Sequence, residues 1–183
     1  MNTVAPEPGA GDPASGRLVR IAHALDLVNH TIGIAARWLT LAMVLVQFAV
    51  VVLRYVFGTS FIWAQELVLY LHAFLFMLAA GYTLLVDQHV RVDVFYSRLD
   101  ARGRAWVDLL GTLGLLLPAC VAIVAYSWRF AWRSWTILEG PISVGGIPAS
   151  FLLKSLVPLF AALLFLQGLS LALKSLDRLR AQP

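Results

Sequence analysis

A few polar side chains stand inside long apolar stretches, where such groups are costly unless something binds them. Glu66 lies near the start of one stretch, and His72 follows roughly two helical turns later. Gln47 and Gln167 lie inside two other stretches. A carboxylate in these surroundings suits a proton or cation site, and an imidazole suits a haem ligand. Each chemistry requires further residues at a matching depth.

The position of Glu66 does not favour an ion site. It lies only a few residues inside its stretch, whereas the coupling sites of transporters lie near the middle of the membrane. Arg54, Gln65 or water can satisfy a carboxylate at the boundary. We therefore interpret Glu66 as a boundary carboxylate.

A haem site is disfavoured as well, because a haem often takes a pair of axial ligands held at matching depths on facing helices. His72 is the one histidine within an apolar stretch, and the others are His23, His30 and His89. A His72 that hydrogen-bonds a neighbour is the simpler interpretation. Gln47 and Gln167 are also expected to form hydrogen bonds between helices, within this chain or with another subunit.

No set of catalytic residues accompanies these side chains. The sequence shows no nucleophile–base pair, no phosphate-binding loop and no cluster of metal ligands, and its single cysteine excludes a disulfide scaffold. We therefore predict a protein that is not an enzyme and that binds no cofactor or metal.

The amino-acid composition also argues against an enzyme and indicates a membrane protein. The 183 residues are 60% hydrophobic and only 13% charged, whereas soluble domains carry about 25% charged residues. This excludes a water-soluble globular enzyme and a disordered chain. It also excludes a nucleic-acid binder, whose basic residues would cluster on a polar surface.

Four apolar stretches are long enough to cross a membrane as helices, since each crossing needs roughly 20 residues. We predict an all-α integral membrane protein with a single domain at 17–178, in which an amphipathic segment at 17–33 precedes the first span. Residues 1–16, rich in Ala, Pro and Gly, and 179–183 are predicted tails. The predicted spans are about 35–57, 61–86, 106–128 and 147–173.

Four spans place both termini on the same side of the membrane. Cytoplasmic segments carry the excess of Lys and Arg. The two terminal segments and the loop between spans two and three carry ten of these residues, and the opposite loops carry four. Both termini are therefore expected in the cytoplasm.

The loop after the second span holds apolar residues at helical spacing, from Val92 to Leu99. This predicts a short helix over about 92–104 that lies on the membrane surface; an extended start followed by a simple turn is the alternative. In the third span, small residues predict close packing against another helix. They are Gly111, Gly114, Ala119, Ala122 and Ala125.

Several short motifs resemble one family of membrane proteins. They are Arg54-Tyr55-Val56-Phe57, Trp63-Ala64-Gln65-Glu66, His89-Val90-Arg91-Val92-Asp93, Gly145-Gly146-Ile147-Pro148 and Pro158. In this order, over roughly 35–175, they resemble the DctQ-like small membrane subunit of the tripartite ATP-independent periplasmic (TRAP) transporters. Gln65 departs from the family, which often has a second acidic residue there, so a role for paired carboxylates is in doubt.

The resemblance implies a subunit of the bacterial cell inner membrane with no transport chemistry of its own. In the family, a periplasmic substrate-binding protein captures an organic acid, and a large membrane subunit carries it across by an elevator-type movement driven by a sodium gradient. The small subunit supports the static part of the large one and offers part of the docking surface for the binding protein. The implied partners are these two proteins and membrane lipids.

The resemblance also suggests roles for individual residues. The outer turn is expected to be fixed by Arg54, Trp63 and Glu66, with an ion pair between Arg54 and Glu66. The interfacial helix is expected to be anchored by His89, Arg91 and Asp93. The candidates for docking the binding protein are Arg129, Arg133, Glu139 and Lys154.

Two other classes of protein stay open at this point. A four-helix membrane anchor subunit of a redox enzyme would bind haem or quinone, and paired axial ligands would favour it. A homo-oligomeric channel would be favoured by a charge or a polar stripe at the middle of the membrane.

Overall fold

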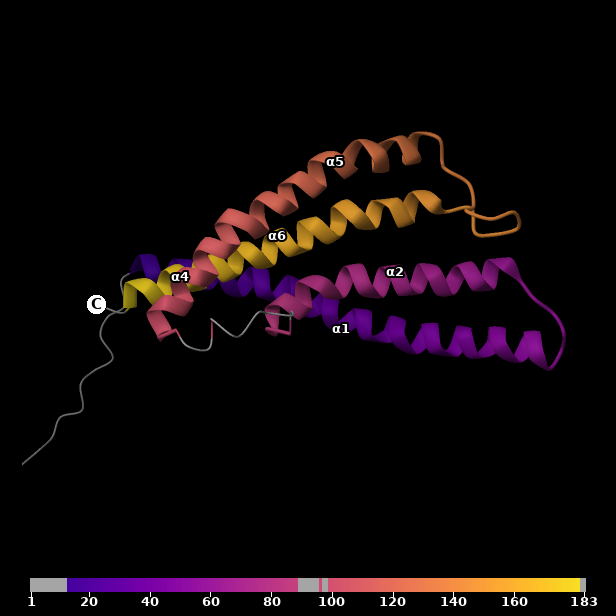
Figure 1. Ribbon diagram of the computed structural model, residues 1–183, viewed down its shortest axis with the longest axis horizontal. Helices are drawn as coiled ribbons and strands as arrows, with labels where there is room; N and C mark the ends of the chain where they lie inside the picture. The colour runs from indigo at the N-terminus through magenta and orange to yellow at the C-terminus, as the bar shows by residue number, and fades with distance from the viewer. Residues whose placement is uncertain (1–12, 89–95, 97–98, 182–183) are drawn as a thin grey trace, which may run out of the picture.

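The computed structural model describes residues 13–88, 96 and 99–181; at 13–18 and 181 it describes the backbone only. Within that part of the chain all regular structure is helical (Figure 1). The elements are α1 (Pro13–Tyr55), α2 (Ile62–Leu85), α4 (Ala101–Gly111), the π-helical turn η1 (Thr112–Leu116), α5 (Leu117–Thr136) and α6 (Ser150–Ala181).

Four helical segments are long and apolar enough to cross a membrane, which confirms the predicted all-α fold with four spans. They are Val19–Tyr55, Ile62–Leu85, Ala101–Thr136 and Ser150–Arg180. The helix starts of α1 and α4 lie at one end of the molecule with the end of α6, and the loops at 56–61 and 137–149 lie at the other (Figure 1). We call the loop end the outer end.

The first predicted span and the segment before it form one helix. α1 begins at Pro13, inside the predicted tail, because proline suits the first helical turn, where its missing N–H is not needed. Gly33 lies inside this helix and lets α2 come close, since an added Cβ there would stand 2.3 Å from the Tyr82 ring. α1 ends where Gly58 adopts a positive φ of 63°.

The third span begins earlier and ends later than predicted. The Asp100 side chain accepts a hydrogen bond of 2.8 Å from the Gly103 N–H and caps α4. Residues 101–104 of the predicted interfacial helix therefore form the first turn of α4, while 89–95 and 97–98 lie outside the described residues. At the other end, α5 continues to Thr136.

The π-helical turn η1 lies directly before Pro118. Proline has no N–H to donate and crowds the carbonyl four residues earlier, so a wider turn relieves this part of the helix. Two of the small residues of this span have open space around them within this chain, so their close packing against another helix stays a prediction. Gly111 and Gly114 have no atom within 4 Å of an added Cβ.

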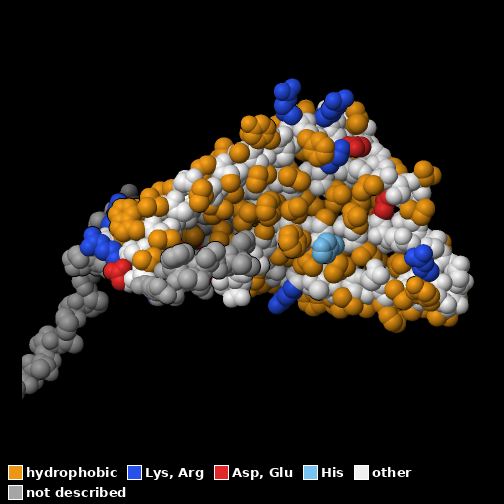
Figure 2. Space-filling view, viewed as in Figure 1, with side chains coloured by type: hydrophobic (Ala, Val, Ile, Leu, Met, Phe, Trp, Pro, Cys, Tyr) orange, Lys and Arg blue, Asp and Glu red, His pale blue; other side chains and the backbone are white. Residues whose placement is uncertain are grey.

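The helices form two pairs, α1 with α2 and α5 with α6, and α6 also packs against α1, α2 and α4. The pairs separate toward the outer end (Figure 1). Hydrophobic side chains cover much of the face in Figure 2. Because apolar side chains dominate this surface, the polar contacts that join one helix pair to the other are the candidates for a functional site.

Candidate functional site

Glu66 connects the start of α2 to the loop between α5 and α6. Its side chain is buried, with 6% of its surface exposed. One carboxylate oxygen accepts a hydrogen bond of 2.8 Å from the Ser143 N–H, and the other accepts one of 2.7 Å from the Ile147 N–H. Hydrogen bonds to an ionised acceptor are among the strong ones. We call Glu66 and these two amides the outer contact.

Two glycines make the outer contact possible. Gly145 has a φ of +83°, a conformation that side chains disfavour. The next residue, Gly146, lies so close to Glu66 that an added Cβ would stand 2.2 Å from a carboxylate oxygen. The Gly145-Gly146-Ile147-Pro148 motif and Glu66, which the sequence analysis singled out separately, therefore form one site.

The predicted ion pair between Arg54 and Glu66 is wrong. Glu66 faces the loop at 143–147, whereas Arg54 is exposed on the last turn of α1 and lines a groove between α1 and α2. Trp63 is also largely exposed and lies beside Phe61, with 6.1 Å between the ring centroids. The outer turn is closed instead by backbone, through a hydrogen bond of 3.0 Å from the Thr59 N–H to the Leu53 carbonyl.

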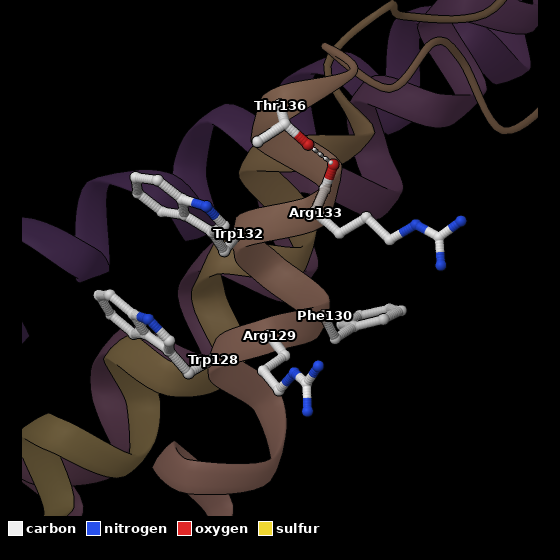
Figure 3. A pocket seen from close by; sticks show the side chains of 6 residues that line it. All are labelled: Trp128, Arg129, Phe130, Trp132, Arg133 and Thr136. Atoms are coloured by element: carbon white, nitrogen blue, oxygen red, sulfur yellow. Dashed lines mark hydrogen bonds between the residues drawn. The ribbon is translucent and has the colours of Figure 1, made fainter.

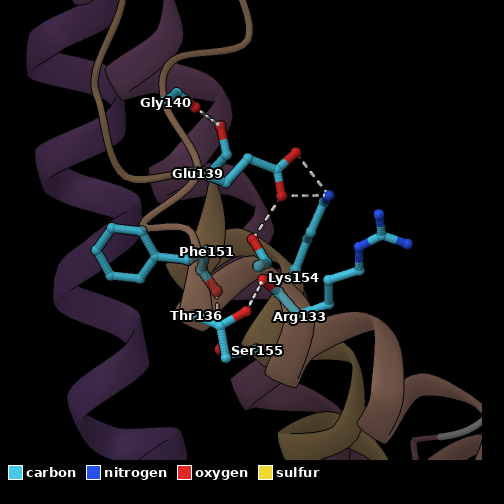
Figure 4. A network of polar contacts seen from close by, with 9 residues as sticks. Arg133, Thr136, Glu139, Gly140, Phe151, Lys154 and Ser155 are labelled. Atoms are coloured by element: carbon cyan, nitrogen blue, oxygen red, sulfur yellow. Dashed lines mark hydrogen bonds and ion pairs between the residues drawn. The ribbon is translucent and has the colours of Figure 1, made fainter.

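A second cluster of polar contacts lies where α5 ends and α6 begins (Figure 4). The Lys154 ammonium donates to both carboxylate oxygens of Glu139, at 2.7 and 2.5 Å. The Ser134 hydroxyl donates to one of them at 2.6 Å. The hydrogen bonds from Lys154 and Ser134 lower the pKa of Glu139. We call these three residues the loop cluster.

The four docking candidates therefore divide into two kinds. Glu139 and Lys154 bind each other, and the Lys154 ammonium also lies 4.3 Å from the centroid of the Phe130 ring. Arg129 and Arg133 are exposed on α5. In Figure 3 both guanidinium groups extend from the same side of the helix, away from Trp128 and Trp132, around a shallow pocket of about 700 Å³.

A third group of polar contacts ties α1 to α6 at the end opposite the loops. The Asn29 amide donates to the Gln167 carbonyl oxygen at 3.0 Å, and the Gln167 amide donates to Asp26 at 3.0 Å. The Ser170 hydroxyl donates to the same Asp26 oxygen at 2.6 Å, and Lys174 binds the other oxygen. We call these five residues the inner cluster. Asn29 and Ser170 are fully buried.

Of these five residues, only Gln167 was predicted to form a hydrogen bond between helices, and Asp26, Asn29, Ser170 and Lys174 were not. The spacing of these residues could have indicated the cluster, because polar residues of α6 recur at i, i+3 and i+7, at 167, 170 and 174. Asp26 and Asn29 share that spacing in α1. Polar residues on one face of each of two apolar helices indicate that the two faces meet.

Gln47 and His72 have a different environment from Gln167. Both are exposed, and neither has a hydrogen-bond partner among the residues that the structure describes. They line one groove between α1 and α2, of about 480 Å³. His72 stacks on Phe76, with 6.2 Å between the ring centroids. His89, Arg91 and Asp93 lie outside the described residues.

The described residues contain no group of three or more His, Cys, Asp or Glu side chains that could hold a metal ion. The polar contacts above join helices and loops to one another. Their chemistry is that of structural support at both ends of a membrane domain.

Comparison with known proteins gives a family match over most of the chain. The family model described as "Tripartite ATP-independent periplasmic transporters, DctQ component" matches residues 43–178. A protein of Vibrio cholerae serotype O1, the "C4-dicarboxylate TRAP transporter small permease protein DctQ", is 26% identical over 115 residues. That match covers 63% of this chain and 49% of the relative, about half its length. No solved structure matches the chain.

Proposed function

This chain belongs to the DctQ component family of the tripartite ATP-independent periplasmic transporters, and we propose that it is the small permease subunit that supports the large membrane subunit of such a transporter. Membership confirms the predicted family and makes the chain a transporter component rather than an enzyme. With its four apolar helices, it is a multi-pass protein of the inner membrane.

The observation that carries the proposal is the extent of the family match. It runs from the middle of α1 to the last turns of α6, and so includes the outer contact, the loop cluster and the α6 side of the inner cluster. These contacts hold the two helix pairs together at both ends. Such an arrangement suits a static support, against which another subunit moves.

The transported substrate class is proposed from the relative. Its name specifies C4-dicarboxylates, so we propose that the transporter served by this chain takes up an organic acid captured by a periplasmic binding protein. We propose sodium-driven, secondary uptake, as the resemblance to these transporters implies.

The orientation follows from charge. Because cytoplasmic segments carry the excess of basic residues, we propose that both termini lie in the cytoplasm and that the outer end faces the periplasm. Arg129 and Arg133 would then be exposed to the binding protein, and we propose them as its docking residues on this subunit.

The test uses a strain of the native host that lacks this chain but keeps the large subunit. Uptake of labelled C4-dicarboxylates is measured with and without sodium, before and after the chain is restored. The tagged chain is also purified in mild detergent, and its partners are identified by mass spectrometry.

We expect uptake to require the chain and the large subunit to copurify with it. Purification of the chain alone, or with a soluble redox subunit and a haem absorption band, would overturn the proposal.

A further inference from the structure

The groove between α1 and α2 carries polar groups at mid-membrane depth. Gln47 lies eight residues before the end of α1 at Tyr55, and His72 ten residues after the start of α2 at Ile62. At 1.5 Å per residue these depths are about 12 and 15 Å. The middle of a hydrocarbon core about 30 Å thick lies at the same depth.

The two side chains face outward from the molecule. Both are exposed, and both line the same groove, whose outer end carries Arg54 and Gln65. A neighbouring apolar hollow of about 370 Å³ shares Gln47 and includes Phe48 and Val51. The surface is thus a polar strip with apolar side chains beside it.

Contact with lipid chains would leave these groups without hydrogen bonds. An amide or imidazole in hydrocarbon loses the hydrogen bonds it makes with water, at a substantial cost. The chain avoids this cost where its helices meet, as Asn29 and Gln167 bind one another at 3.0 Å. On α5, Ser127 also meets this need, because its hydroxyl donates to the Ile123 carbonyl at 2.5 Å.

We propose that the α1/α2 groove is the surface that receives a membrane-spanning helix of the large subunit. That helix presents hydrogen-bonding side chains to Gln47 and His72, and apolar side chains to Phe48 and Val51. The inference rests on the proposed function, because it names the surface through which the proposed partner binds.

The required chemistry defines the partner further. The Gln47 amide offers both donors and an acceptor, and a neutral imidazole offers one donor and one acceptor. The matching helix therefore carries side chains such as Ser, Thr, Asn or Gln at mid-membrane depth, the groups that bind helices together in membranes.

Site-specific photocrosslinking tests the surface. A photoreactive phenylalanine replaces Phe48, in the apolar hollow beside the groove, or, as the matched control, Tyr126 on α5; the two are 67% and 86% exposed. Both variants are expressed with the large subunit and irradiated in membranes. We expect a crosslink to the large subunit from position 48 and none from position 126.

A second test removes the polar groups. The double variant Gln47→Leu with His72→Phe keeps the groove filled but cannot form the hydrogen bonds. We expect its association with the large subunit to weaken by roughly three- to thirty-fold, the range for such bonds between membrane helices. Ser127→Ala on α5 is the control and should leave association unchanged. A lipid-facing groove would give no loss from the double variant, which would overturn the proposal.

The outcomes separate this inference from the proposed function. Crosslinking from position 126 alone would overturn the assignment of the surface and leave the small-subunit function intact. A crosslink between two copies of this chain from position 48 would overturn the choice of partner. Failure of the unsubstituted chain to associate with the large subunit would overturn the proposed function, and this inference with it.

Discussion

The space that a side chain on Gly146 would need is already filled by the Glu66 carboxylate. We expect Gly146→Ala to push Glu66 off the Ser143 and Ile147 amides, because no rearrangement of a methyl group avoids a 2.2 Å approach. The carboxylate is the far end of a flexible side chain and can move, so the cost is that of its two hydrogen bonds, about 1–3 kcal/mol. The thermal midpoint in detergent should therefore fall by several degrees.

Gly140 provides the control for this prediction. It lies in the same loop, it has no atom within 4 Å of an added Cβ, and its φ is not positive. Gly140→Ala should leave the thermal midpoint unchanged. Equal effects of the two alanines would show that the outer contact contributes nothing to stability.

The loop cluster predicts a dependence on pH. Because Lys154 and Ser134 lower the pKa of Glu139 in the folded protein, its contribution to stability is complete above the ordinary glutamate pKa of about 4.3. That contribution is lost as the pH falls through the lowered folded value. The difference in thermal midpoint between the native chain and Glu139→Gln should be constant from neutral pH to about 5 and vanish in more acidic buffer.

Lys154→Met removes the main cause of the shift and should give the same pH profile as Glu139→Gln. A difference between native and Glu139→Gln that persists at the most acidic pH would contradict the assigned role of this carboxylate.

The types of the residues were enough to pick out these sites from the sequence, but the contacts that each residue makes could not be predicted. Glu66 and the Gly145-Gly146 pair were both singled out, yet Glu66 was paired with Arg54, twelve residues away. Its true partners are 77 and 81 residues away. Sequence spacing reports which face of a helix a residue occupies, and that face meets a loop whose position depends on the whole bundle.

Contacts between helices depend on Gly33 of α1 and Gly81 of α2, each of which lies against a side chain of the other helix. A Cβ on Gly81 of α2 would stand 2.0 Å from the Asn29 side-chain oxygen, and Asn29 is fully buried. Gly81→Ala should therefore separate the helices and disturb the inner cluster, at a cost of about 1–3 kcal/mol. The midpoint of unfolding in detergent measures this cost.

Gly111→Ala is the matched control, because this helical glycine has open space around it. The substitution should be neutral or raise stability by up to about 1 kcal/mol, since alanine favours helix. A destabilising Gly111→Ala would mean that the third span packs more closely than the structure shows.

Hydropathy predicted the four spans but not where their helices end. An uncharged stretch marks the part of a helix that fits in lipid, whereas a helix continues until a cap or a strained residue stops it. α1 continues past Arg37 and Asp26 because neither residue breaks a helix. The outward position of Gly111 and Gly114 was also unforeseeable, because a stripe of small residues does not say which neighbour it meets.

At the scale of the whole molecule, polar contacts join the two helix pairs at both ends. Between these contacts the two pairs move apart in the direction of the outer end (Figure 1). Hydrophobic side chains cover much of the face in Figure 2, which leaves that face available to lipid or to another subunit. Arg129 and Arg133 are exposed on the last turns of α5, and in Figure 3 both extend from the same side of the helix.

Reversal of charge at Arg133 tests the role of that end. Exposed charges at the rim of an interface mainly set the rate of encounter. Arg133→Glu should lower uptake by roughly two- to tenfold at limiting binding protein, with a smaller effect at high salt. The amount of large subunit that copurifies should not change.

Arg180→Glu makes the same change of charge at the opposite end, on the last turn of α6. In the proposed orientation Arg180 lies on the cytoplasmic side, away from the binding protein, and its substitution should leave uptake unaltered. Unchanged uptake by Arg133→Glu in low salt would remove Arg133 from the docking surface.

The outer contact also sets an order of events during synthesis. Ile147 follows Glu66 by 81 residues, which a ribosome adds in about 4–16 s at 5–20 residues per second. During that interval the Glu66 carboxylate lies at the membrane surface without the Ser143 and Ile147 amides that later bind it. The two halves of the chain are therefore locked at the outer end only after the third helix has crossed and the loop that follows it has emerged.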